Sequence, residues 1–229
     1  MKRFAFLGIL LLVGVGICRA DNDWEELSDE DGIKVWKRDV PGSPIVALKG
    51  EAIVEAPVAK VASVLDDNSR DGEWVCSLVE AKVLRQISPT ARIEYNHTHA
   101  PWPIKDRDFV FHAEVKADTS AKTLTYELRS IEDKLMPEDE DKAVRGELID
   151  SRYILKADGN RTRLVVIIQA DPRGSVPKWL VNLFQRAWPR ETIEGIRAQC
   201  AKADVKELAA ATAWLESGTA PVTSAAMKE

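Results

Sequence analysis

The chain has 229 residues, of which 45 % are hydrophobic and 30 % are charged, a composition ordinary for a globular protein. Its net charge of −5 excludes the basic field that would attract nucleic acid or draw the whole protein to anionic lipid. The length suits one or two domains, and a weakly structured C-terminal stretch favours one.

The first 20 residues have the pattern of a secretory signal peptide. A basic MKR start precedes fifteen uncharged, mostly apolar residues, and Ala20 stands just before an acidic segment. The apolar run is shorter than the ~20 residues that a membrane-spanning helix needs. We predict cleavage after Ala20 and export to the periplasm or the exterior, with an uncleaved anchor or lipid attachment at Cys18 as alternatives. Removing residues 1–20 changes the net charge from −5 to −8, and the short leader and compact chain suggest a bacterial source.

The mature chain begins with a predicted helix and two predicted strands. Residues 23–32 indicate a short acidic helix that ends at Gly32, and residues 33–40 and 45–54 indicate strands. Pro57 then stands where proline favours the first turn of a helix. Further strands are predicted at 78–87, 91–98, 107–117, 122–130, 144–156 and 161–170, with an acidic loop at 136–142.

The hydrophobic period changes after the last strand. Pro177 begins a predicted helix whose apolar residues recur at spacings of one, three and four, and Pro189 must kink or interrupt it. From residue 209 the composition cannot bury much, so we predict a flexible tail at 209–229 after a domain at 21–208. The apolar stripe of the helix comprises Trp179, Leu180, Leu183, Phe184, Ala187 and Trp188.

This order of elements predicts an α+β fold. A run of antiparallel strands, interrupted early by helices, is followed by one long amphipathic helix. A curved sheet with that helix laid in its concave side satisfies the order, because the apolar strand faces need a cover. The helix stripe is broader and more aromatic than docking on a filled core would require.

Motifs for catalysis or cofactor binding are scarce. The sequence has no nucleophile elbow, phosphate-binding loop or zinc-type cysteine pair, so we expect neither an enzyme nor a cofactor. His97 and His99 could share a metal, but the spacing supplies no third ligand and we predict no metal site. Cys76 and Cys200 could pair in an oxidising compartment, although two separate buried thiols are the favoured interpretation.

One predicted strand carries a charge on its apolar face. Within residues 107–117, Arg107 heads the face that holds Phe109 and Phe111, and polar residues dominate the other face. An unpaired charge in an apolar interior is very costly. The guanidinium therefore bends out to solvent, pairs with an internal carboxylate such as Glu94, or binds an anionic ligand, for which a phosphate is well matched.

Several spaced motifs resemble the StAR-related lipid-transfer (START) domain family. APWPIKDRDFVF at 100–111 is similar to the family's P-W-P segment followed by R-D-F/Y-V, and ADPRGSVPKWLVN at 170–182 is similar to its D/N-P-x-G-x-x-P-x-W-L/V segment. VRGEL at 144–148 and a D-x-x-R-x-x-x-W pattern at 67–74 extend the match. The resemblance covers about residues 24–205, and several motifs in the right order make it specific.

The resemblance implies a helix-grip fold of the START/Bet v 1-like type, a curved antiparallel sheet wrapped around the C-terminal helix and enclosing a lipid tunnel. By position, Arg107 is expected to contact a lipid phosphate and Trp102 to contact a membrane. Ser175 replaces a second membrane-facing tryptophan of one relative, and Ala113 replaces an arginine of sterol-binding members, which argues mildly against a sterol. The expected lipid-binding residues are Arg107, Phe109, Phe111, Tyr126, Leu180 and Phe184.

The function predicted from the sequence is non-catalytic binding and intermembrane transfer of one amphipathic lipid, with a phospholipid favoured. We expect a monomer that contacts membranes transiently, does not bind nucleic acid, and opens between the helix from Pro177 and the Trp102 loop. One alternative is a helix-grip enzyme of the cyclase or hydratase type acting on a hydrophobic small molecule. The other is a lipid-sensing module that binds a partner.

Overall fold

The computed structural model describes residues 23–134, 136–139 and 141–217, so the predicted signal peptide and residues 218–229 lie outside the described residues. The elements in chain order are β1 (Glu25–Glu30), β2 (Ile33–Arg38), β3 (Ala47–Val54), α1 (Val58–Asp66), the 3-10 helix η1 (Asn68–Glu73), β4 (Leu78–Ser88), β5 (Ala91–Thr98), β6 (Arg107–Asp118), β7 (Thr123–Ser130), β8 (Val144–Arg145), β9 (Glu147–Asp158), β10 (Arg161–Asp171), α2 (Lys178–Gln185), α3 (Trp188–Cys200) and α4 (Ala209–Ser217).

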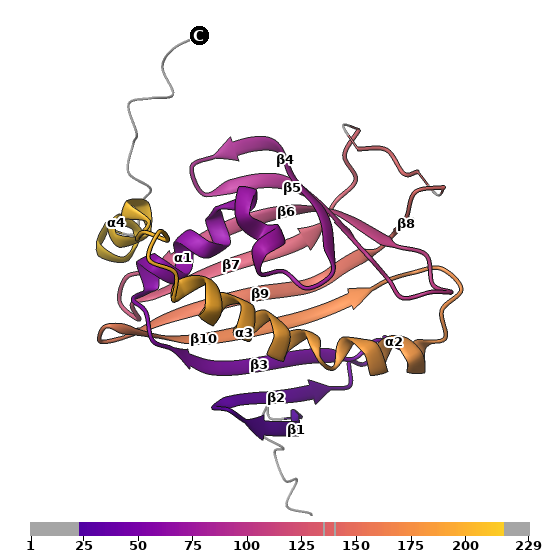
Figure 1. Ribbon diagram of the computed structural model, residues 1–229, viewed down its shortest axis with the longest axis horizontal. Helices are drawn as coiled ribbons and strands as arrows, with labels where there is room; N and C mark the ends of the chain where they lie inside the picture. The colour runs from indigo at the N-terminus through magenta and orange to yellow at the C-terminus, as the bar shows by residue number, and fades with distance from the viewer. Residues whose placement is uncertain (1–22, 135, 140, 218–229) are drawn as a thin grey trace, which may run out of the picture.

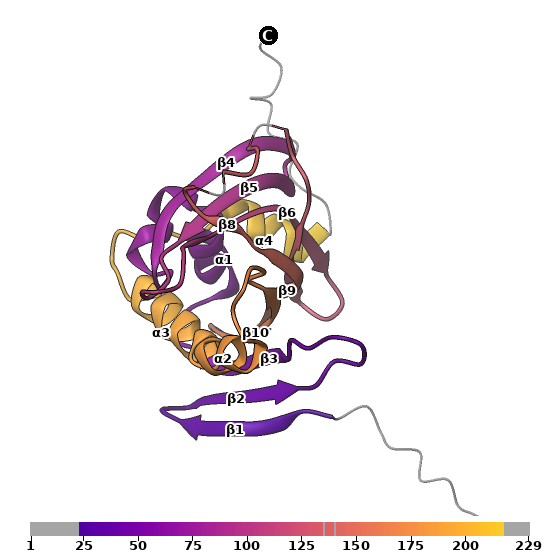
Figure 2. The same cartoon turned by 90° about the vertical axis from the view of Figure 1, so that its right-hand side faces the viewer.

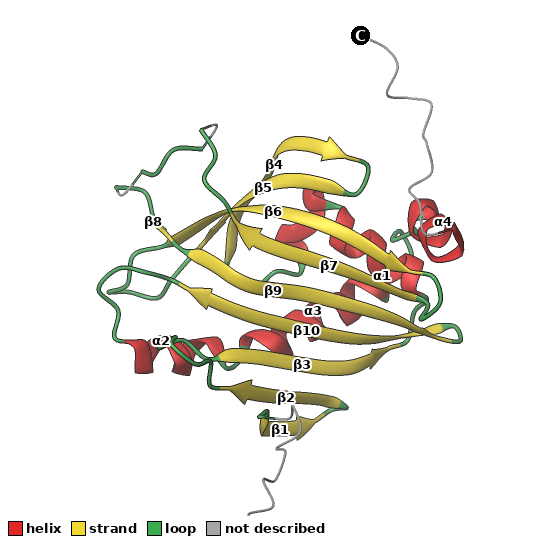
Figure 3. Cartoon of the chain, turned by 180° about the vertical axis from the view of Figure 1, so that it is seen from behind, coloured by secondary structure: helices red, strands yellow, loops and turns green. Residues whose placement is uncertain are grey.

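One curved sheet of ten strands dominates the molecule. Its order is β1-β2-β3-β10-β9-β7-β6-β5-β4, with β8 pairing in parallel to β6 at one end. The helices α1, α2 and α3 lie on one side of this sheet (Figures 1 and 3). Seen end-on, the sheet curls around the interior, and α2 and α3 run along its open side (Figure 2). The predicted α+β helix-grip architecture is therefore confirmed.

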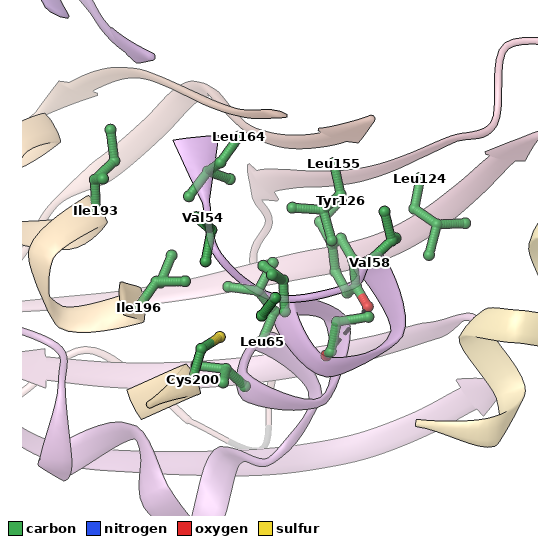
Figure 4. Packing of buried hydrophobic residues seen from close by; sticks show 14 of the residues in the cluster. Val54, Val58, Leu65, Leu124, Tyr126, Leu155, Leu164, Ile193, Ile196 and Cys200 are labelled. Atoms are coloured by element: carbon green, nitrogen blue, oxygen red, sulfur yellow. Dashed lines mark hydrogen bonds between the residues drawn. The ribbon is translucent and has the colours of Figure 1, made fainter. Parts of the chain in front are cut away.

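Packed side chains fill the interior at the end where α1, α3 and α4 meet. The apolar residues of α1 recur at spacings of three and four, so they form one buried face against the strands. Figure 4 shows this face meeting side chains from the strands and from α3. The cluster includes Val54, Val58, Leu65, Leu124, Tyr126, Leu155, Leu164, Ile193, Ile196 and Cys200.

Two glycines allow α3 to lie close to its neighbours. A Cβ added to Gly50 on β3 would lie 2.9 Å from both Ile193 Cδ1 and Pro189 Cβ, and one added to Gly195 would lie 2.4 Å from the Trp74 carbonyl oxygen. Neither distance is compatible with a side chain, because packed interiors leave no such overlap. The helix is thereby held between β3 and the segment after η1.

The predicted N-terminal acidic helix is wrong, because residues 25–30 form the edge strand β1. Asp31 and Gly32 both have positive φ values, as expected for an Asp-Gly hairpin turn. Across the hairpin, Asp29 pairs with Lys34 and Glu25 with Lys37, each at 3.0 Å. The acidic residues thus serve cross-strand ion pairs on a sheet edge, where charge also discourages pairing with other chains.

Three further boundaries differ from the sequence expectation. The strand predicted at 144–156 is divided at Gly146, where a Cβ would lie 2.4 Å from the Phe109 ring. The helix predicted from Pro177 is divided into α2 and α3, and Pro189 stands in the first turn of α3, the interruption that proline favours. A flexible tail from residue 209 is wrong for 209–217, which form α4, in which Trp214 is only 3 % exposed.

Burial of Trp214 predicts that α4 is part of the stable fold. Trp214→Ala is expected to lower the free energy of unfolding by about 3–5 kcal/mol, the usual effect of removing a buried aromatic side chain. Trp102→Ala is the matched control, since Trp102 is 92 % exposed, and it should change stability by no more than ~0.5 kcal/mol. Urea unfolding measures both, and equal small effects would mean that α4 does not dock.

Candidate functional site

A cavity of about 460 Å³ lies between the sheet and the α2 end of the helical layer. Strands β5, β6, β7, β9 and β10 supply its wall, and the segments around residues 74–77, 99–104 and 172–176 surround it. Its volume falls within the range of about 300–1,000 Å³ that is usual for small-molecule sites. Its apolar wall includes Phe109, Phe111, Leu128, Leu148, Ile168 and Trp188.

The register of β5 against β6 decides which side chains face this cavity. Glu94 pairs with Phe111, and Thr98 pairs with Arg107. Paired residues in adjacent strands point to the same side of the sheet. The inward face of β6 therefore carries the aromatic residues, whereas the inward face of β5 brings charged and amide side chains into the same cavity.

Asn68 joins two buried carboxyl groups inside the cavity. Its Nδ2 donates to Asp71 Oδ2 and to Glu94 Oε2, each at 3.1 Å. Arg92 donates to the other oxygen of Glu94 and to Asp66. Asp71 and Glu94 are 6 % and 5 % exposed, so the cavity contains a hydrogen-bonded cluster of polar side chains shielded from bulk solvent.

Burial changes the acidity of this cluster. Desolvation, followed by the charge of Glu94, raises the pKa of Asp71 to about 7. Desolvation also raises the pKa of Tyr153, and the charges of Asp71 and Glu94 add to that shift. Asn96 Oδ1 is buried without a hydrogen-bond partner among the described residues. These acceptors suit a ligand that brings N–H or O–H donors.

Arg107 does not pair with Glu94, which binds Asn68 and Arg92 instead. The Arg107 guanidinium donates to three backbone carbonyl oxygens, from Nε to Pro172 at 3.1 Å, from Nη2 to Arg173 at 3.3 Å and from Nη1 to Lys105. The side chain is 6 % exposed and borders the cavity. Burial lowers the pKa of Arg107. Of the three alternatives for Arg107, the outward bend to solvent and the pairing with Glu94 are therefore wrong.

Trp102 stands at the exposed tip of the loop between β5 and β6. It is 92 % exposed, which excludes packing in the core. At the base of this loop, Asp106 accepts a hydrogen bond from the Ala100 N–H at 3.0 Å, and His97 Nε2 and His99 Nδ1 each lie 3.0 Å from its carboxylate oxygens. The Ala100 bond in particular lowers the pKa of Asp106. Within the described part of the chain, no cluster of three or more histidine, cysteine, aspartate or glutamate side chains is arranged to hold a metal ion.

The remaining predicted lining residues divide into three groups. Phe109, Phe111 and Tyr126 line the cavity, and the Tyr126 hydroxyl also donates to the Ala62 carbonyl of α1 at 3.4 Å. Leu180 does not line the cavity, because α2 presents Val181 and Gln185 instead. The side chain of Phe184 lies outside the described residues.

Most of the polar cluster does not follow from the sequence. Asn68 and Asp71 lie in the polar segment at 67–74, and only the fold brings this segment against β5. The alternation of side chains along the strand predicted at 91–98 places Arg92 and Glu94 on the same face, and this pattern could have indicated that both point inward. Tyr153, inward on β9, had the same signal.

The two described cysteines are both free. Cys76 is exposed at the rim of the cavity, so the expectation of a buried thiol is wrong there. Cys200 is buried in the packed end, and burial raises its pKa to about 11. Among the described residues, no helix is long and apolar enough to cross a membrane.

A helix-grip fold around an apolar cavity is typical of a class of ligand-binding proteins. Comparison with known families identifies the family within this class. The START domain model matches residues 16–201, and the chain belongs to that family. An uncharacterized protein of Pseudomonas aeruginosa is 28 % identical over 180 residues, covering 79 % of this chain and 88 % of that protein. Human START domain-containing protein 10 is 23 % identical over 220 residues, covering 93 % of this chain and 74 % of that protein.

Solved structures show the same fold. A STAR-related lipid transfer protein fragment from Xanthomonas axonopodis has a TM-score of 0.72 and 27 % identity, covering 79 % of this chain and all of the fragment. Human StAR-related lipid transfer protein 5 has a TM-score of 0.73 and 20 % identity, covering 80 % of this chain and 88 % of that protein. Both of these solved relatives are named as lipid transfer proteins.

The raised pKa of Asp71 predicts a pH-dependent stability. Its folded-state pKa of about 7 lies above the usual carboxyl value, so the folded chain binds more protons than the unfolded chain between the two values. The free energy of unfolding should therefore fall as pH rises from about 4 to about 7, by up to ~1.4 kcal/mol per pH unit. Asp71→Asn should remove this contribution from the pH dependence measured by urea unfolding.

The exposed Glu132 provides a control for that measurement. Glu132→Gln removes a carboxyl group from the surface and should keep the wild-type pH dependence. An Asp71→Asn variant with the same pH dependence as wild type would contradict the assigned shift.

Proposed function

We propose that this protein binds one amphipathic lipid, preferably a phospholipid, in its cavity and transfers it between membranes without chemical change. The observation that carries the proposal is the cavity itself, in which an apolar wall surrounds an internal polar cluster. Such a site favours a ligand that is mostly hydrocarbon and has one polar end. Membership of the START family supports the same conclusion, as do two solved relatives that are named as lipid transfer proteins.

The proposed position of the head group is the cluster around Asn68. Asp71 and Glu94 can accept hydrogen bonds from an ammonium or hydroxyl group, and Arg92 stands beside them as a cation. A zwitterionic head group carries both an ammonium and a phosphate, and so matches this pairing of charges. Arg107 is a separate locus, because Glu94 lies opposite Phe111 and four residues along β6 correspond to about 13 Å.

Mass spectrometry of the purified mature chain tests this function. A phospholipid extracted with the protein is the expected result. Ala113→Phe should reduce the amount retained, because Ala113 lines the cavity and a larger side chain would occupy it. Ala121→Phe is the control at an exposed turn and should retain the wild-type amount. A cavity that never carries lipid, combined with turnover of a hydrophobic small molecule, would support the enzyme alternative instead.

Trp102→Ala is predicted to slow lipid exchange more than it lowers equilibrium lipid affinity. Exposed tryptophan favours the membrane–water interface, and Trp102 does not line the cavity. Transfer of a fluorescent phospholipid between vesicles gives the rate, and binding to the isolated protein gives the affinity. An unchanged rate would remove Trp102 from the membrane-contacting surface.

We further propose that the protein acts after export, because the first 20 residues have the features of a signal peptide, and that the exported chain is a monomer. The intact mass of the exported chain should then begin at Asp21. A mature chain that retains Met1 would contradict export with cleavage.

A further inference from the structure

Asp71 is the carboxyl group of the polar cluster that has no cationic hydrogen-bond partner among the described residues. Arg92 donates to Glu94 and to Asp66, so its guanidinium is already bonded to two other carboxylates. The side-chain donor to Asp71 is the neutral Asn68 amide, at 3.1 Å. Because burying a carboxylate without an opposite charge is costly, Asp71 favours its protonated form until a ligand supplies that charge.

The surroundings of Asp71 are acidic on balance. The charged or titratable groups that act on it or line the same cavity from the packed elements are Asp67 beside η1, Arg92 and Glu94 on β5, Tyr126 on β7, Tyr153 on β9 and Glu191 on α3. Cys76, His99 and Arg107 line this cavity from the loops and from the start of β6.

These surroundings hold Asp71 near half-protonation at neutral pH. Desolvation and the negative charges of Glu94 and Asp67 outweigh the opposite effects of Asn68 and Arg92, so the pKa of Asp71 is about 7. The carboxyl group is therefore about nine-tenths protonated at pH 6 and about nine-tenths ionised at pH 8.

A primary ammonium group is the ligand chemistry that matches this arrangement. Asp71 and Glu94 both line the cavity, and both lie 3.1 Å from the same Asn68 amide nitrogen. An ammonium group with three N–H donors can therefore bond to both carboxyl groups and bring the positive charge that Asp71 lacks. A trimethylammonium group has the charge but no N–H donor, and a polyol has O–H donors but no charge.

We infer that Asp71 selects lipids with a primary ammonium head group by proton exchange: the bound ammonium group replaces the proton of the Asp71 carboxyl group, and that proton passes to the solvent. The inference rests on the proposed lipid binding, since it names the class of head group that the polar cluster accepts. The ionised form of Asp71 is the binding form. Affinity for such a lipid should therefore rise with pH up to about 7 and level off above it.

Isothermal titration calorimetry with soluble short-chain lipids tests this exchange on the wild-type chain. The probes are phosphatidylethanolamine, phosphatidylcholine and phosphatidylglycerol with the same acyl chains. At pH 6, titration in two buffers of different ionisation enthalpy should show that phosphatidylethanolamine releases about one proton per lipid bound, and its affinity should be about tenfold higher at pH 8 than at pH 6. The other two lipids should release no proton and show no such rise.

Asp71→Asn tests the assignment to this carboxyl group. The variant should lose both the proton release and the pH dependence, and at pH 8 it should bind phosphatidylethanolamine at least about tenfold more weakly, because a charge-assisted hydrogen bond is lost. Glu132→Gln, at an exposed position, is the matched control and should behave as the wild-type chain does.

The outcomes separate this inference from the proposed function. If phosphatidylethanolamine binds without releasing a proton, or if phosphatidylcholine releases as many, proton exchange with a primary ammonium group is wrong and lipid binding stands. The wild-type measurement decides this even if Asp71→Asn does not fold. If none of the three lipids binds and no lipid is extracted with the purified chain, the proposed function is wrong and the inference falls with it.

Discussion

The close contact of α3 with β3 and with the Trp74 segment determines the shape of the interior. Gly50 and Gly195 permit this contact, because a Cβ at either position would overlap its neighbours. With α3 held there, its C-terminal half packs with α1 against the strands and fills one end of the concave side. The helix is interrupted between Gln185 and Trp188. On the N-terminal side of this interruption, α2 covers the other end of the concave side of the sheet without filling it. A single sheet thus supports both a packed core and a cavity.

The polar cluster in the cavity adds an unfavourable burial term to this otherwise hydrophobic interior. Burying an ionised carboxylate is unfavourable unless hydrogen bonds and opposite charge compensate. Here Asn68 and Arg92 supply both, and Asp71 still has its pKa raised to about 7. An apolar filling of the same space is often the more stable one, so the cluster is the feature of the cavity on which the proposed head-group position rests.

Local patterning predicted most of the fold from the sequence. Alternation of apolar residues indicated the strands from 78 to 170, and Pro177 and Pro189 indicated where helices begin and break. The missed elements depended on partners distant in the chain. The acidic residues of β1 form a strand by pairing with β2, where Lys34 and Lys37 lie beside them. The alanine-rich segment of α4 has high helix propensity, but its stability depends on Trp214 reaching the packed end.

The site was predictable to the extent that its residues share one strand. Arg107, Phe109 and Phe111 follow from a period of two along β6, and all three line the cavity. Their partners do not follow, because the carbonyl groups at 172–173 and the Asn68 side chain are brought there by the closure of the sheet on its helices.

Two polar loci in one cavity need not perform the same task, and their bonding separates them. At the interior cluster, carboxylates and amides bond to one another, so their geometry is set by the folded walls η1 and β5. At the other locus, Arg107 donates to backbone carbonyl groups of two loops, so its guanidinium is positioned by loops rather than by strands. Rigid walls can select a head group without moving, whereas loops held by one side chain can move without disturbing the fold. The two loci on the same strand pair therefore differ in what positions them, folded walls at the cluster and loop backbone at Arg107.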